Sequence, residues 1–400
     1  MNISNLFKFA GLLTAFSFLI FLSGCSKGRM AEGHMDTPET HYRQGMRYWN
    51  DGDYKRAEEH FKLAESLDRR FAPAVAGLAL TTAKNAQQAS EVRESENLFR
   101  DAHRLADRAK RLDRRTPEPW IAKALVISME HEGEELGRWF RSMEREFEGA
   151  LNVDPDNPEV YYHRGLAYKR TFQFTKAGND FRKIIELNTR FVGAADREWQ
   201  QIQMIERAAP GTQVGKQIAL VDRISRADIA ALFISELRID RLISRRGHRN
   251  YDTHFQAPED PRAMEVNQII TKDKVTDLDG HWARNFIMDI VDLQIRGLEP
   301  YPDRTFKPNE LITRGEYAMM VEDVIISIMG DPSMATMHIG TQSRFPDVNP
   351  SHPAYNAICN AVDRGIMSAE MNGEFGLQRH VSGPEALLVI RNLQELNRVE

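Results

Sequence analysis

Apolar residues recur every three or four positions from about residue 38 to the carboxyl end of the chain, with polar residues between them. This spacing places the apolar side chains along one face of a helix. Pairs such as Gly52-Asp53 and Pro210-Gly211 interrupt the pattern with residues that favour turns. The pattern predicts an all-α chain, and two kinds of repeat are visible within it.

The first kind of repeat is clearest between Tyr42 and Leu67. Small residues at Gly45 and Ala57 would let two antiparallel helices approach closely, and Phe61 would fill the space between them. The Gly52-Asp53 pair would make the turn. This spacing resembles a tetratricopeptide repeat, which implies a helical array that recruits a protein partner through its concave face.

Further copies of this repeat follow along the chain. A second good copy spans Tyr162–Phe181, and two poorer copies lie between them. In the poorer copies we expect helix pairs over residues 74–86 with 98–112 and 120–129 with 140–151. About four repeats over residues 38–190 and a closing helix at 194–208 predict a tetratricopeptide-like solenoid at residues 38–209. Stacked repeats bury a continuous core that no single pair could bury alone.

The second kind of repeat is most complete between Asp277 and Glu316. Its parts are Asp277-Leu278-Asp279-Gly280-His281-Trp282-Ala283, Tyr301-Pro302-Asp303-Arg304-Thr305-Phe306-Lys307-Pro308-Asn309 and Ile312-Thr313-Arg314-Gly315-Glu316. Thr313 and Glu316 have the spacing of a helix capping box. The whole segment resembles an S-layer homology motif, in which Arg304 replaces the loop glycine and Gly315 replaces an alanine.

Two partial copies flank the complete one. Ser382 lies 69 residues after Thr313 and His352 lies 71 after His281, which supports a true repeat. We predict an S-layer-homology-like domain at residues 210–400. It comprises a partial repeat (210–243), an insertion (244–272), a complete repeat (273–330) and a degenerate repeat (345–397). The resemblance implies that three such repeats pack into one pseudo-threefold helical domain.

The partial copies depart from the motif in different ways. The first has a second-helix start at Ser225-Arg226 but no recognisable loop, and the helix around Trp199 is a candidate for its first helix. The third has Gly383 where the motif has arginine, and no Tyr-Pro-Asp loop is visible in it. At most two of the three pockets should therefore bind ligand.

Arg314 is the candidate ligand-binding residue of the complete copy. At the first helical position it lies beside free amides and the positive end of the helix dipole, where an anion is favoured. The resemblance implies a cell-wall polysaccharide with carboxylated or pyruvylated sugars, bound by Arg226, Trp282, Asp303 and Arg314. Two alternatives are that Trp282 belongs to the core and that Arg314 makes only an ion pair with a neighbouring repeat.

The amino terminus has a different pattern. Phe9–Leu22 is an almost unbroken apolar run, too short for a comfortable membrane-spanning helix, and it ends in Leu22-Ser23-Gly24-Cys25. This ending resembles a lipobox, which implies a lipoprotein signal peptide at residues 1–24, an acylated Cys25 and a flexible tether at 25–37. Ser26 after the cysteine implies the outer membrane, facing the periplasm. An ordinary signal peptide or an anchor with an incidental cysteine is the alternative.

Composition narrows the function further. The net charge of −5 argues against a general nucleic-acid binder, and the basic residues around Arg108 are interrupted by Asp107 and Asp113, as on a solvated helix face. The only cysteine besides Cys25 is Cys359, so no structural disulfide is expected once Cys25 is acylated. We find no motif for a metal, a cofactor or a catalytic centre.

Together these features predict a non-enzymatic lipoprotein scaffold of the cell envelope. It would bind cell-wall polysaccharide or peptidoglycan-linked glycan through the carboxyl-terminal domain and a protein partner through the array. The alternative is a lipoprotein subunit of an outer-membrane assembly, secretion or polysaccharide-export complex, with the carboxyl-terminal domain as a protein interface. A cryptic hydrolase is a third and weaker hypothesis.

Overall fold

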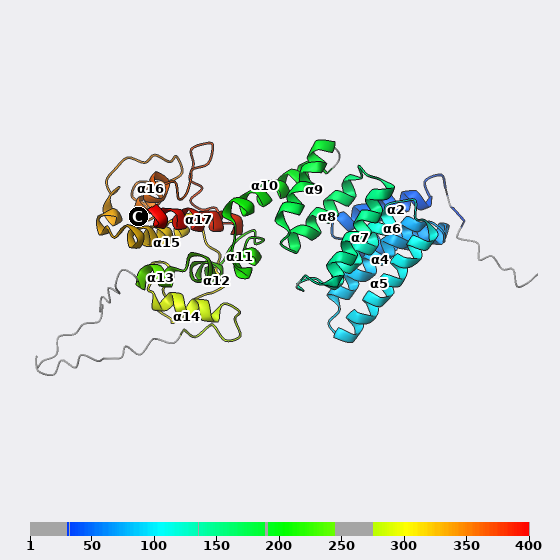
Figure 1. The fold of residues 1–400 in the computed structure, drawn as a ribbon, viewed down its shortest axis with the longest axis horizontal. Coiled ribbons are helices and arrows are strands. Elements are labelled where there is room, and N and C mark those ends of the chain that lie inside the picture. The colour runs from blue at the N-terminus through cyan, green and yellow to red at the C-terminus, as the bar shows by residue number, and fades with distance from the viewer. Residues whose placement is uncertain (1–29, 32, 135, 189–190, 245–274, 400) are drawn as a thin grey trace, which may run out of the picture. The chain divides into compact units, whose positions relative to one another are not determined.

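A computed structural model describes residues 30–31, 33–134, 136–188, 191–244 and 275–399. All regular elements in these ranges are helical, which confirms the predicted all-α class (Figure 1). The described residues form two compact units, one reaching Ala167 with Glu186–Phe191 added, the other comprising Tyr168–Ile185 and the chain from Val192 onward. No helix within the described ranges combines the length and apolarity needed to cross a bilayer.

Some of the expectations concern residues outside these ranges. They are the signal peptide at 1–24, the acylated Cys25 and nearly all of the insertion at 244–272. The predicted boundary between residues 209 and 210 follows the sequence pattern, whereas the compact units divide near Ala167. The helix after Phe191 therefore belongs to the second unit.

The first unit is an array of helical hairpins. Its helices are α2 (Pro38–Asn50), α3 (Tyr54–Leu67), α4 (Ala72–Gln88), α5 (Val92–Leu112), α6 (Glu118–Glu130), α7 (Arg138–Val153) and most of α8 (Pro158–Arg170). Helices α2 and α3, α4 and α5, and α6 and α7 pack as pairs, as the sequence predicts. Helix α4 also packs on both α3 and α6, so one core runs through successive hairpins.

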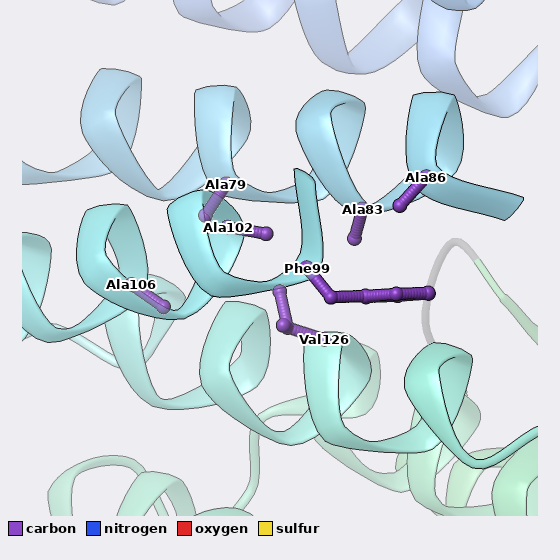
Figure 2. Packing of buried hydrophobic residues seen from close by; sticks show 7 residues of the cluster. All are labelled: Ala79, Ala83, Ala86, Phe99, Ala102, Ala106 and Val126. Carbon is purple, nitrogen blue, oxygen red and sulfur yellow. The ribbon is translucent and has the colours of Figure 1, made fainter. Parts of the chain in front are cut away.

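Glycine and alanine make the close helix contacts possible. A Cβ atom on Gly45 would lie 2.5 Å from the ring of Phe61, and one on Gly77 would lie 2.6 Å from the same ring. The fully buried Phe61 therefore fills space that two glycines leave open, as the spacing predicts. Farther along the array, a second cluster joins α4, α5 and α6 (Figure 2). Its members are Ala79, Ala83, Ala86, Phe99, Ala102, Ala106 and Val126.

Ion pairs connect neighbouring hairpins on the outside of this core. Arg108 of α5 reaches Glu65 of α3 at 2.5 Å, and Lys110 of α5 reaches Glu146 of α7 at 2.5 Å. Arg104, in contrast, pairs with Asp101 one turn earlier and is largely exposed. Part of the basic cluster thus holds the array together instead of forming a free cationic face.

Two histidines meet between the first two helices, and they predict a dependence of stability on pH. The Nδ1 atoms of His41 and His60 are 3.2 Å apart, and Asp36 holds the other nitrogen of His41 at 2.8 Å. Burial, followed by the charge of His41, lowers the pKa of His60 below its usual 6.5. The unfolded chain then binds a proton more readily, so stability should fall as pH drops below about 6.5.

Thermal unfolding at pH 7.5 and pH 5 measures this effect. We expect a loss of about 1 kcal/mol or less, because the site is partly solvated, and we expect His60→Gln to reduce it. The exposed His34 provides the matched control, since His34→Gln should leave the pH dependence unchanged. An unaltered pH dependence in His60→Gln would contradict the assignment.

The second unit contains the remaining helices. They are α9 (Phe174–Leu187, mostly in this unit), α10 (Val192–Ala208), α11 (Gln213–Ile218), α12 (Arg226–Leu232), α13 (Ile239–Ser244), α14 (Arg284–Asp292), α15 (Arg314–Met329), α16 (Tyr355–Asp363) and α17 (Gly383–Val399). A π-helical turn (Phe233–Leu237) follows α12, and a short 3-10 helix (Pro332–Thr336) follows α15.

The last residues before α12, α15 and α17 close a ring of three hydrogen bonds. The amide of Ile224 donates to Val381 at 2.9 Å, that of Val381 to Ile312 at 3.1 Å, and that of Ile312 to Ile224 at 3.1 Å. Capping boxes start α12 and α15, the first made by Ser225 and the second by Thr313. This cyclic arrangement is what a pseudo-threefold packing of three repeats requires.

Helix packing follows the same threefold order. Helix α14 packs on α12, α16 packs on α15, and α10 packs on α17. Ile202 and Ile205 of α10 are fully buried. Helix α10, which contains Trp199, therefore takes the place of the missing first helix of the first repeat, as the sequence suggests.

Candidate functional site

Arg226, at the first position of α12, is inserted into the loop of the next repeat. Its guanidinium donates to the carbonyl oxygens of Gly297 (2.6 Å), Phe306 (2.8 Å) and Glu299 (3.0 Å). It also lies over the rings of Phe306 and Tyr301, with 4.6 and 5.0 Å to the ring centres. Only 6% of its surface is exposed, so most of its binding capacity is used within the protein.

Arg314, at the first position of α15, repeats this arrangement one repeat later. It donates to the carbonyl oxygens of Ser368 (2.8 Å) and Phe375, lies 4.4 Å from the ring centre of Phe375 and pairs with Glu385 at 2.8 Å. Burial lowers the pKa of Arg314, and the charge of Glu385 opposes that shift. The alternative that Arg314 forms an ion pair with a neighbouring repeat is confirmed.

The third repeat does possess the loop, so the prediction that it lacks one is wrong. The amide of Tyr301 donates to Thr305 at 2.8 Å in the second repeat, and the amide of Glu370 donates to Glu374 at 2.7 Å in the third. Both loops then pass a buried phenylalanine, the second of them Phe375. The backbone is the same, although the third loop has none of the Tyr-Pro-Asp letters.

An aspartate upstream of each loop holds it in place. Asp277 accepts the amides of Phe306 (2.8 Å) and Lys307 (2.7 Å). Asp347 accepts those of Phe375, Gly376 and Leu377 at 2.7, 2.7 and 3.0 Å. Burial opposes ionisation of Asp347, but these amides hold its pKa below the usual value. The interval of 70 residues between the two aspartates was the sequence signal for the third loop.

A groove of about 300 Å³ opens beside Arg226 between the first and second repeats. Its lining residues include Arg226, Glu299, Tyr301, Glu310, Glu316 and Met320. The hydroxyl of Tyr301 donates to Glu310 at 2.7 Å. Burial, followed by this hydrogen bond, raises the pKa of Tyr301, so the phenol keeps its proton.

The charges in this groove favour some ligands over others. Three carboxylates, those of Glu299, Glu310 and Glu316, line it with one guanidinium whose donors are bound to carbonyl oxygens. The net charge is negative, so hydroxyl groups and ammonium groups are better suited to the groove than carboxylates. Neither Tyr301 nor Glu310 was singled out from the sequence as a binding residue.

The equivalent position between the second and third repeats is occupied by protein. Arg379, 69 residues after Glu310, pairs there with Glu370 at 3.2 Å and with Glu385 at 3.0 Å. These ion pairs cross the space that Tyr301 and Glu310 border in the other groove. Of these two positions, only the groove at Arg226 therefore presents uncompensated carboxylates.

The other predicted binding residues lie outside the groove. Trp282 precedes α14 and is 54% exposed, so the alternative that it belongs to the core is wrong. Asp303 lies exposed at the loop tip, where hydrogen bonds from the hydroxyl and amide of Thr305 lower its pKa. Of the four predicted residues, Arg226 lines the groove, whereas Trp282, Asp303 and Arg314 do not.

Comparison with protein families agrees with both kinds of repeat. The S-layer homology domain matches residues 276–318 and 344–386, and the tetratricopeptide repeat matches residues 38–71 and 158–190. The chain carries both repeats. The S-layer homology matches begin and end around the two loops held by Asp277 and Asp347, so the degenerate third repeat is a true member of the set.

Individual relatives are distant. Cell surface glycoprotein 1 of Acetivibrio thermocellus is 30% identical over 109 residues, which are 26% of this chain and 4% of that protein. The chain thus spans a small fraction of that relative's length. A crystal structure of a thermophilic tetratricopeptide-repeat protein from Thermus thermophilus is 16% identical, with a TM-score of 0.35, covering 42% of this chain and 81% of that one.

These repeats indicate a binding protein of the cell envelope. S-layer homology repeats indicate binding at the cell wall, and tetratricopeptide repeats indicate interaction with proteins. Both are typically modules without catalytic activity. Within the described residues, no three histidine, cysteine, aspartate or glutamate side chains gather where they could hold a metal ion.

Proposed function

We propose that the protein is a non-enzymatic connector of the cell envelope. Its S-layer homology unit would hold cell-wall polysaccharide or peptidoglycan-linked glycan, and its tetratricopeptide array would hold a protein partner. A lipid on Cys25 would anchor it, in the outer membrane with the repeats facing the periplasm. The lipobox-like ending at Cys25 supports the anchor, and the open groove at Arg226 is the observation that carries glycan binding.

The groove supports a revised ligand chemistry. Arg226 is bound to three carbonyl oxygens, and three glutamates line the groove, so a carboxylated sugar would meet net repulsion. We propose a neutral or amine-bearing glycan whose hydroxyl or ammonium groups pair with Glu310 and Tyr301. The exposed ring of Trp282 and the carboxylate of Asp303 are proposed as secondary contacts, and Arg226 and Arg314 as the residues that shape the grooves.

Titration of the full chain with three soluble oligosaccharides tests this proposal. The probes are an N-acetylglucosamine oligomer, its de-N-acetylated form and its form oxidised to uronic acid. We expect the amine form to bind roughly tenfold more tightly than the carboxylated form, equal to about 1.4 kcal/mol. Glu310→Gln should remove most of that preference, because it removes the carboxylate that Tyr301 holds in the groove.

Matched variants separate local from general effects. Glu395→Gln changes the same charge on the exposed face of α17 and should leave all three affinities unchanged. Trp282→Ala should weaken binding without lowering stability, because its ring is largely exposed. Tighter binding of the carboxylated oligomer, or no retention of the protein on purified sacculi, would contradict the proposal.

A further inference from the structure

The first helices of four successive hairpins, α2, α4, α6 and α8, line a narrow hollow in the first unit. Its walls are mainly apolar and its floor is made of small residues. The lining residues include Tyr42, Met46, Ala76, Gly77, Leu80, Glu118, Ala122, Leu125, Glu159 and His163. The volume is about 10 Å³, the space of a single water-sized group. The hollow therefore admits one small polar group at its floor and not a ring.

A carboxylate without a partner faces this hollow. The Oε2 atom of Glu118 is buried and has no hydrogen-bond partner in the structure. Burial, followed among the charges by that of Glu159, raises the pKa of Glu118. A buried acceptor left without a partner is costly, and the cost is relieved when a donor is supplied. Glu118 thus marks the point at which a ligand would gain most.

The charges around the hollow indicate which donor fits. Glu159 also lines it, with His163 3.9 Å away, and no lysine or arginine is among its lining residues. A cation is therefore favoured over a neutral donor. An ammonium group has the size of one water molecule, whereas a guanidinium is a planar group of several atoms. Charge and size together select a lysine side chain.

We propose that this hollow binds one lysine of an extended segment of a protein partner. The ammonium group would pair with Glu118 and Glu159, and apolar side chains on either side of the lysine would pack on Met46, Leu80 and Leu125. This inference rests on the proposed role of the array in binding a protein and names the chemistry of that partner. It concerns the first unit alone.

Selection from a display library of random twelve-residue peptides on the full chain tests this inference. The selected peptides should share one lysine with apolar neighbours. The tightest of them, labelled with fluorescein, should lose at least tenfold in affinity when its lysine is replaced by norleucine. Glu118→Gln should weaken binding to a similar extent and should not lower the melting temperature, because it removes a buried charge that lacks a partner.

The control variant is Glu148→Gln, which changes the same charge at an exposed position of α7. It should bind the labelled peptide as the unaltered chain does. Selection of no peptide, of acidic peptides, or of peptides that bind Glu118→Gln unchanged would overturn the inference. Retention on sacculi, measured in the same preparations, reports on the connector function separately, since no residue of the hollow belongs to the glycan groove.

Discussion

Replacing Arg314 by alanine is expected to lower the free energy of unfolding of the carboxyl-terminal unit by about 3–5 kcal/mol. The guanidinium is 3% exposed and bonds to two carbonyl oxygens of the third repeat. Its removal would leave those acceptors buried without donors and would leave Glu385 without this partner. The loss would therefore exceed that of a surface ion pair severalfold.

Denaturant unfolding combined with hydrogen exchange of the peptides covering α15 and α17 measures the effect and locates it. Arg391→Ala is the matched control, because Arg391 pairs only one turn away with Glu395 on the surface of α17. That pair should contribute about 0.3–0.5 kcal/mol. A loss below about 1 kcal/mol for Arg314→Ala would show that the arginine does not hold the repeats together.

The fold was largely predictable from local patterns. Gly45 and Phe61 have a spacing that only a tight helical hairpin explains, and the structure places the glycine directly against that ring. The capping box of Thr313 and Glu316 likewise marks the start of α15 correctly. These features act over a few residues of sequence, so a single chain reveals them. The first helix of the first repeat was recognisable only by elimination, because α10 lacks the motif's letters.

The site was less predictable, because it depends on contacts between repeats. Arg226 and Arg314 were found, but their partners are carbonyl oxygens 54 to 80 residues away, and backbone atoms leave no trace in the sequence. The direction in which a guanidinium points cannot be derived from helix position alone. Departures from the motif also acquire reasons only here: a Cβ on Gly315 would lie 2.5 Å from Leu377.

The threefold ring explains why the third arginine is absent. Arg226 enters the loop of the second repeat and Arg314 enters that of the third, so an arginine after Ser382 would have to enter a loop of the first repeat. The segment Ile218–Val221 lies there instead, and the amide of Gly383 donates to Val221 at 2.8 Å. The glycine therefore closes the ring by direct backbone contact, and its lack of a side chain is a requirement of that contact.

Substitution of Gly383 by alanine or by the arginine of the motif should consequently destabilise the unit by about 3 kcal/mol or more. A Cβ atom at this position would lie 1.8 Å from the carbonyl oxygen of Ile218 and 3.1 Å from that of Val221. Backbone atoms cannot move aside as a flexible side chain can, so the contact between α17 and the first repeat would have to open.

Gly193→Ala is the matched control for this substitution, since nothing lies within 4 Å of a Cβ on that residue of α10. It should be neutral or stabilise the unit by up to about 1 kcal/mol, as alanine does in a helix. The melting temperatures of the two variants should therefore move in opposite directions. If Gly383→Arg were instead as stable as the unaltered chain, the first repeat would have to possess a loop that accepts the arginine, and the ring would not be closed by glycine.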